Sequence, residues 1–123
     1  MFKIGSEPFL ECSSKGDKRF SAFYARIKRF GNRSIEEIYQ GAKVFEDGST
    51  GLTPQQAKGK KAINMDKVSI LYDRLWWIYL KENPELIDVI YQYNGFSDVF
   101  GKANCQCQAR SIYKCKEYNI KEV

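Results

Sequence analysis

The sequence predicts a single compact α+β domain in which a small antiparallel sheet packs against several helices, including a helical hairpin. Three observations support this fold class. An aromatic-rich, alternating segment is typical of a strand, two motifs for helix N-termini follow it, and a long apolar segment comes next. The 123 residues suffice for one hydrophobic core. We therefore assign residues 1–123 to one domain, in which residues 1–19 carry the weakest pattern.

The first predicted element is a strand over residues 19–27. The segment RFSAFYARI alternates between two faces and is rich in aromatic and β-favouring residues. After a turn at FGNR, Ser34 and Glu37 have the spacing of a capping box, which predicts a short helix that runs to about Ala42. Residues 44–45 are consistent with a second short strand.

A loop rich in glycine and hydroxyl groups raises the question of phosphate binding. Its sequence EDGSTG, residues 46–51, favours a tight reversal, and TPQQ at 53–56 predicts a capped helix that stops at Gly59. Because unpaired N–H groups at a helix N-terminus favour anions, residues 48–51 are candidates for phosphate or ribose contact. An ordinary capped turn that positions AKGKK explains the same pattern, and the spacing of a Walker loop is absent.

A strongly apolar helix is predicted from Asn64 or Asp66 to the break at Asn83-Pro84. Large apolar residues, two tryptophans among them, surround most of its circumference. Such a helix requires cover on nearly every side, which predicts a homo-oligomer. A second helix begins at Pro84, and a left-handed cap at residues 94–95 is expected to end it, so that the two helices form the hairpin.

The composition limits the chemistry that the chain can perform. The absence of histidine excludes Ser-His-Asp and Cys-His catalysis, and we expect a protein that is not an enzyme and uses no cofactor. Glu36 and Glu37 are neighbours in the predicted helix and point in different directions, which favours a solvated face over a catalytic pair. The four cysteines lack a C-x-x-C pair, which predicts free thiols and no metal site.

Charge and hydropathy indicate the kind of partner. The net charge of +5 and the pI near 9.0 favour an anionic partner. No apolar run approaches the ~20 residues that span a bilayer, and the N-terminal segment lacks the order of a signal peptide. We therefore expect a cytosolic protein without a membrane partner.

The C-terminal segment NGFSDVFGKANCQCQARSIYKC combines flat hydrophobic residues with planar hydrogen-bonding groups. This mixture suits a purine nucleotide. Aromatic stacking contributes roughly 1–3 kcal/mol per base, amides and carboxylates bond base edges and hydroxyls, and arginine grips phosphate with two hydrogen bonds. Phe96 and Phe100 could instead belong to the core, which is the commoner role for phenylalanine.

Five motifs of the chain resemble those of a known family. FYARIKRFGNRSIEEIYQGAKVFEDGSTGL, AKGKKAIN, WWIYLKENPEL, GFSDVFG and CQARSIY occur in this order, and they are similar to small phage and prophage proteins of the Thoeris anti-defence type-one group. The resemblance implies a non-enzymatic sponge that binds cyclic ADP-ribose isomers in the host bacterial cytoplasm and so blocks Thoeris immune signalling. It also implies capture of cyclic oligonucleotides at separate sites of an oligomer.

Within the matching regions, side-chain chemistry selects the candidate ligand-binding residues of this nucleotide-binding domain. Arginines and a lysine would neutralise the diphosphate, phenylalanine rings would stack on adenine, and amide or carboxylate groups would bond ribose or base edges. The candidates are Phe23, Arg26, Arg33, Lys43, Phe45, Asn94, Phe96, Asp98, Gln106, Gln108 and Arg110.

Two other functions stay open. A nucleic-acid-binding module would track the backbone with basic residues, although acids interrupt these and no recognised motif appears. These basic residues are Arg26, Lys28, Arg29, Arg33, Lys58, Lys60 and Lys61. An enzyme that processes ADP-ribose would instead use Glu36, Glu37 or Asp98 as its carboxylate.

Overall fold

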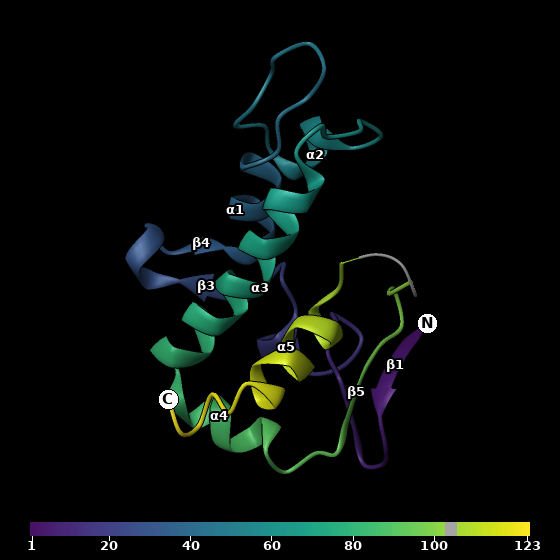
Figure 1. Cartoon of the computed structure of the whole chain (residues 1–123), viewed down its shortest axis with the longest axis vertical. Helices are drawn as coiled ribbons and strands as arrows, with labels where there is room; N and C mark the ends of the chain where they lie inside the picture. The colour runs from purple at the N-terminus through teal and green to yellow at the C-terminus, as the bar shows by residue number, and fades with distance from the viewer. Residues whose placement is uncertain (103–105) are drawn as a thin grey trace.

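The computed structural model describes residues 1–102 and 106–123 and confirms the α+β class. Helices and short strands follow one another along the chain and form one compact unit (Figure 1). In order, the elements are β1 (Phe2–Gly5), β2 (Phe9–Glu11), η1 (Lys18–Phe20), β3 (Arg26–Ile27), η2 (Lys28–Phe30), β4 (Arg33–Ser34), α1 (Ile35–Gly41), α2 (Pro54–Ala57), α3 (Met65–Glu82), α4 (Pro84–Ile90), β5 (Gly95–Asp98) and α5 (Gln108–Glu117).

The larger sheet is mixed rather than antiparallel, which corrects the expectation from the sequence. Its strand order is β1-β5-β2, with β5 antiparallel to β1 and parallel to β2. The two N-terminal strands run in opposite directions like the arms of a hairpin, but β5 inserts between them. A pairing between strands so far apart in the chain leaves no local signal. The smaller sheet is the antiparallel pair β3-β4.

Helix α3 is the centre of the fold and contacts α1, α4, α5 and β3. Its side chains Leu75, Trp76 and Leu80 are fully buried. The chain itself therefore covers most of this helix, whereas Ile70 stays 61% exposed. Helix α4 follows directly after Asn83 and packs on α3, as the predicted pair requires. Among the described residues, no helix has the length and hydropathy needed for a bilayer crossing.

Both predicted capping boxes are confirmed. The Glu37 N–H donates to Ser34 Oγ and the Ser34 N–H donates to Glu37 Oε1, each at 3.1 Å, where α1 begins. At α2, Thr53 and Gln56 exchange the equivalent hydrogen bonds. The hydrogen bonds of each capping box join residues only three apart in the chain, so they do not depend on distant contacts.

Two other local predictions were wrong. The strand expected over residues 19–27 is reduced to β3, because Asp17 caps a 3-10 turn and Ser21 accepts from two following N–H groups. The left-handed cap at residues 94–95 does not form. Tyr91 ends α4 in a right-handed conformation, and the N–H groups of Asn94 and Gly95 donate to Pro8, which starts the pairing of β5.

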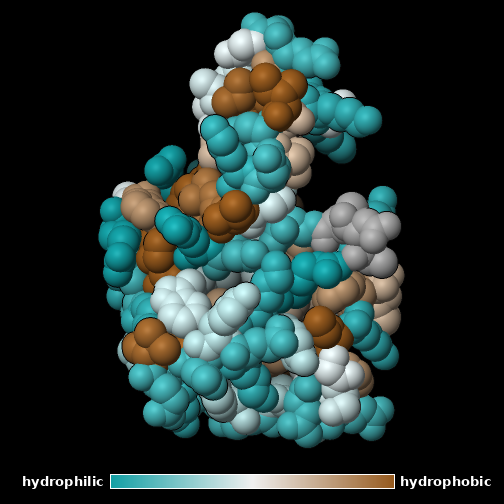
Figure 2. All heavy atoms as spheres, viewed as in Figure 1, coloured by the Kyte–Doolittle hydropathy of each residue, from teal (hydrophilic) through white to brown (hydrophobic). Residues whose placement is uncertain are grey.

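Residues 44–63, which include α2, form a lobe that projects from the body (Figure 1). Figure 2 shows hydrophobic side chains on its surface. Residues 44–45 do not form the expected strand and make only isolated bridges, to Thr50 and Ala62. The Asn64 side chain closes the lobe, because it accepts from Val44 N and donates to Ala42 O, at 3.0 and 3.2 Å.

The two capping boxes allow a matched test of which helix stabilises the domain. We expect Ser34→Ala to lower the free energy of unfolding by about 1 kcal/mol, since it removes an N-cap from a helix packed on α3. Thr53→Ala removes the same motif from α2, whose single buried residue is Ala57, and should cost clearly less. Urea denaturation of both variants measures this difference. Equal losses would show that the lobe and the body unfold as one unit.

Candidate ligand-binding groove

A groove of about 450 Å³ lies between α1 and the segment around α2. One wall is the outward face of α1, the other is the lobe, and an exposed aromatic ring stands at its edge. The aromatic, charged and amide residues that line it are Phe23, Glu36, Gln40, Lys43, Gln55, Lys58 and Lys60.

The polar wall comes from one face of α1 and from the segment that directly follows this helix. Glu36, Gln40 and Lys43 follow one another at spacings of four and three residues, which places them on the same side of α1 and its C-terminal end. The Gln40 Nε2 group donates to Glu36 Oε1 at 2.7 Å. The opposite face of α1 carries the buried residues Ile35 and Ile38. The amphipathic pattern of α1 therefore directs Glu36 and Gln40 into the groove, and Lys43 joins them from the segment after the helix.

Lys43 is the half-buried cation of this wall. Its Nζ lies 4.7 Å from the centroid of the Tyr39 ring, within the range of a cation–π interaction. Burial lowers the pKa of the Lys43 ammonium, and the charge of Glu36 opposes that shift. The Tyr39 ring is fixed in turn, because it packs edge to face on Tyr72 with centroids 4.8 Å apart.

Phe23 supplies the groove with an accessible aromatic surface. Its side chain is 62% exposed, although phenylalanine is usually buried. It lies in the turn between η1 and β3, in the segment that the sequence had predicted to be strand. Lys58, which is exposed, lies on the α2 side of the groove. The groove thus combines a flat apolar surface with cationic and hydrogen-bonding groups.

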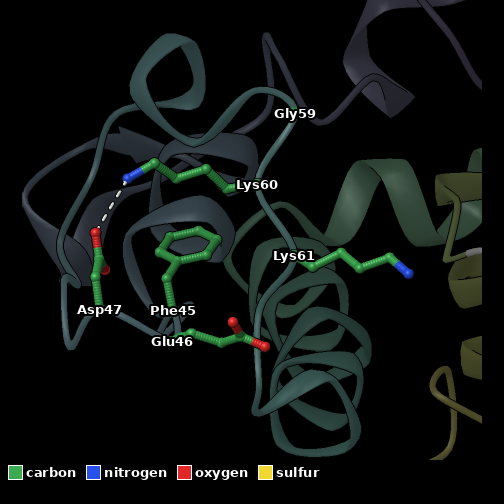
Figure 3. Close-up of a pocket in the computed structure, with 6 residues that line it drawn as sticks. All are labelled: Phe45, Glu46, Asp47, Gly59, Lys60 and Lys61. Carbon is green, nitrogen blue, oxygen red and sulfur yellow. Dashed lines mark ion pairs between the residues drawn. The ribbon is translucent and has the colours of Figure 1, made fainter.

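A second cavity of about 440 Å³ shares Gly59 and Lys60 with the groove. Figure 3 shows Lys60 reaching across the Phe45 ring towards Asp47, whereas Lys61 points away from the other side chains. The Lys60 Nζ lies 3.6 Å from Asp47 Oδ2 and 5.5 Å from the ring centroid. The ammonium group of Lys60 therefore belongs to this second cavity. Phe45 is only 3% exposed, so its ring supports the lobe.

Most N–H groups of the glycine-rich loop already have acceptors within the protein. The N–H groups of Gly48 and Gly51 donate to Phe45 O and Gly41 O, each at 2.9 Å. The Ser49 N–H donates to Asp47 Oδ1, also at 2.9 Å. Gly48 and Gly51 have φ values of +83° and +70°, which explains why glycine is needed there. These bonds favour the capped-turn interpretation of the loop over a phosphate site.

Arg26 and Arg33 lie away from the groove, on the β3-β4 pair. Arg26 donates to Asn32 O at 2.9 Å and lies 3.8 Å from Glu37. Arg33 donates to Phe30 O at 3.0 Å and borders a separate hollow of about 240 Å³ with Glu37. The two adjacent glutamates of α1 do point in different directions, as predicted. Glu36 lines the groove, and Glu37 closes the capping box.

The C-terminal candidates lie in the body of the domain, and several of them hold the fold together. Phe96 is fully buried in β5 and packs edge to face on Tyr113, so its ring is not available for stacking on a ligand in this structure. Asp98 is 1% exposed and accepts from Gln108 Nε2 at 2.6 Å. Gln108 Oε1 accepts from Tyr72 Oη at 3.1 Å. Burial raises the pKa of Asp98.

The other three C-terminal candidates also have partners in the fold. Gln106 Nε2 donates to Asp73 Oδ1 at 2.7 Å, beside α5. Asn94 Nδ2 donates to Glu7 O at 3.0 Å. The Arg110 guanidinium lies 4.6 Å from the centroid of the Phe2 ring. The structure thus brings Phe23 and Lys43 together and places the remaining candidates elsewhere.

Cys12, Cys107 and Cys115 are buried free thiols, as predicted, and Cys105 lies outside the described residues. Burial raises the pKa of all three described thiols, that of Cys115 to about 12. Within the described residues, no group of three or more carboxylate or thiol side chains could hold a metal ion.

The sequence interpretation missed Gln40 and Gln55 and assigned Glu36, Lys58 and Lys60 only to alternative functions. A signal was present for Gln40, because Glu36 and Gln40 are four residues apart in a helix whose start is marked by a capping box. Comparison of the sequence with models of known families and with curated proteins found no match. The groove is therefore assessed on its own chemistry.

The two glutamates of α1 allow a pH test of the different roles of Glu37, in the capping box, and Glu36, in the groove. Hydrogen bonds from Ser34 lower the pKa of Glu37 in the folded state, so its carboxylate adds stability above its unfolded pKa. This contribution disappears as the pH falls through the folded pKa. We expect Glu37→Gln to cost roughly 0.5 kcal/mol at neutral pH and nothing near pH 2, measured by urea denaturation. Glu36→Gln removes a carboxylate of the same helix that takes no part in the capping box, and it serves as the control for the loss of charge.

Proposed function

We propose that the protein binds cyclic ADP-ribose isomers in the groove and sequesters them without cleavage, as a phage anti-defence protein in the host bacterial cytoplasm. The observation that supports this most is the combination of the exposed Phe23 ring with Lys43 and Lys58 around one opening of about 450 Å³. This volume falls within the range of small-molecule sites. The resemblance to the Thoeris anti-defence group supports the identity of the ligand.

Each part of the ligand has a complementary group in the groove. Adenine would stack on Phe23, which contributes roughly 1–3 kcal/mol. The diphosphate would lie near Lys43 and Lys58. The bonded pair of Gln40 and Glu36 offers donors and acceptors for ribose hydroxyls. Cyclic oligonucleotides also contain bases, sugars and phosphates, so we include them in the proposed class of ligands.

Sequestration requires enclosure, which we propose a second copy of the chain supplies. Nanomolar affinity corresponds to about −12 kcal/mol. A ligand with on the order of 35 heavy atoms reaches about −11 kcal/mol at the usual −0.3 kcal/mol per atom, and only when nearly all its atoms are covered. The groove is open to solvent on one side. Ile63, at the end of the lobe, and Ile70, on α3, are 63% and 61% exposed, and we propose them as apolar contacts for association.

The nucleic-acid alternative is less well supported, because several of its basic residues already form ion pairs or hydrogen bonds within the protein. Arg29 Nε lies 3.3 Å from Glu82 Oε2, Arg26 pairs with Glu37, and Lys60 pairs with Asp47. For the alternative of ADP-ribose processing, Glu36 is the one carboxylate of Glu36, Glu37 and Asp98 that lines the groove. Heat denaturation of the complex distinguishes sequestration from processing. A sequestered nucleotide is released intact, whereas a processed one is released as fragments.

The stacking role of Phe23 can be tested with a matched phenylalanine. We expect Phe23→Ala to weaken the binding of cyclic ADP-ribose about tenfold or more by calorimetry, because it removes the stacking surface. Phe100→Ala is the control, since Phe100 is 61% exposed and lies outside the groove. Equal affinity of the two variants would exclude Phe23 from the site, and absence of binding by the wild type would refute the proposed function.

The proposed association can be tested separately. We expect light scattering to show an oligomer for the wild type and a shift towards monomer for Ile70→Glu, because a charge on the exposed apolar surface opposes contact. Lys3→Glu, at an exposed position of β1, is the control for added negative charge. A wild-type protein that stays monomeric at all concentrations, with and without ligand, would contradict this part of the proposal.

A further inference from the structure

Lys43 combines a fixed position with a reactive environment, and this combination suggests chemistry beyond reversible binding. Its backbone is held on both sides, because its N–H donates to Gln40 O at 3.2 Å and Thr50 Oγ1 donates to its carbonyl at 2.9 Å. Its side chain lies over the Tyr39 ring and borders the groove. The amine is thus placed at one wall of an open site.

We propose that Lys43 is a nucleophilic amine that forms an imine with the aldehyde of an open-chain ribose phosphate bound in the groove. The geometry that carries this inference is the grouping of Glu36 and Gln40 of α1 with Lys43, two residues beyond the end of that helix, along one wall of the groove, while the exposed Lys58 lies on the α2 side. The ligand class is a phosphorylated sugar with a free anomeric carbon, such as ribose 5-phosphate or linear ADP-ribose. Cyclic ADP-ribose isomers have no free anomeric carbon and stay non-covalently bound.

The environment of Lys43 supplies what a lysine nucleophile needs. Only the neutral amine carries the lone pair that attacks a carbonyl, and partial burial favours the neutral form. Burial lowers the pKa of Lys43, which agrees with this requirement, and the charge of Glu36 opposes only part of the shift. Arginine at the same position would keep the charge but could not react, since its guanidinium stays protonated.

The chemical step balances without an additional reactant. The Nζ lone pair forms a bond to C1 of the aldehyde, and the carbonyl oxygen gains a proton while nitrogen loses one, which gives a carbinolamine. Protonation of its hydroxyl group releases water, and the nitrogen lone pair forms the C=N bond. Glu36 is the acidic group of the groove that can carry these protons. Hydrolysis of the imine reverses the sequence and restores both partners.

This inference rests on the proposed function only in assuming that the groove accepts a ribosyl phosphate. The test is reductive trapping of the full-length protein. We incubate it with ribose 5-phosphate and cyanoborohydride and measure the intact mass, which should increase by the sugar phosphate minus one oxygen atom. Peptide mapping should place the modification on Lys43. Unphosphorylated ribose should give about tenfold less product, because it has no phosphate group to pair with Lys58.

Variants separate this reaction from general modification of surface lysines. Lys43→Arg should lower the early adduct at least about tenfold while its circular dichroism matches the wild type. Lys18→Arg is the matched control, because the Lys18 Nζ also lies over a tyrosine ring, 5.1 Å from the centroid of Tyr24, but is exposed outside the groove. Adduct spread over exposed lysines and unchanged by Lys43→Arg would overturn the proposal.

A calorimetric titration with cyclic ADP-ribose distinguishes failure of this inference from failure of the proposed function. Binding of the cyclic ligand without trapping of ribose 5-phosphate would remove the nucleophile and leave sequestration intact. Trapping at Lys43 without binding of the cyclic ligand would support the reactive amine and remove the sponge. Failure of both would show that the groove does not accept ribosyl phosphates.

Discussion

The packing of α1 on α3 is the constraint on which the candidate groove depends. Ile35 and Ile38 are buried on one side of α1, and Tyr39 meets Tyr72 of α3 edge to face at 4.8 Å. These contacts fix the orientation of α1 about its axis, so that Glu36 and Gln40 face the groove and Lys43 follows at the end of the helix. The capping box fixes where the helix begins and hence the phase of this pattern. The polar wall of the groove is thus a consequence of the hydrophobic core.

Elements whose signals lie within a few residues could be predicted from the sequence. Ser34 with Glu37 and Thr53 with Gln56 marked two helix starts, and Pro84 marked the start of α4. Elements that depend on distant partners could not. The insertion of β5 between β1 and β2 rests on a pairing across most of the chain, and the aromatic segment before β3 folds into turns because its hydrogen-bond partners are nearby.

The candidate site was only partly predictable, because the same residue types serve a ligand and a core equally well. Phe23 and Phe96 were indistinguishable as stacking residues, yet the first is 62% exposed and the second fully buried. Asp98 and Gln108 have the chemistry of ribose ligands, but they satisfy each other and Tyr72 inside the protein. Buried polar groups need such partners, so a polar cluster in a sequence indicates an internal network as readily as a binding site.

The distribution of the positive charges limits the class of ligand that the groove can bind. Asp47 engages Lys60, Glu82 engages Arg29, and Glu37 lies near Arg26, so the net charge of +5 is not concentrated in the groove. Glu36 also offsets part of the charge of Lys43. A polyanion would gain little from this balance, since its affinity grows with the number of neutralised phosphates. A ligand with few phosphates, a flat base and sugar hydroxyls matches the groove better, because stacking and hydrogen bonds can then supply most of the binding free energy.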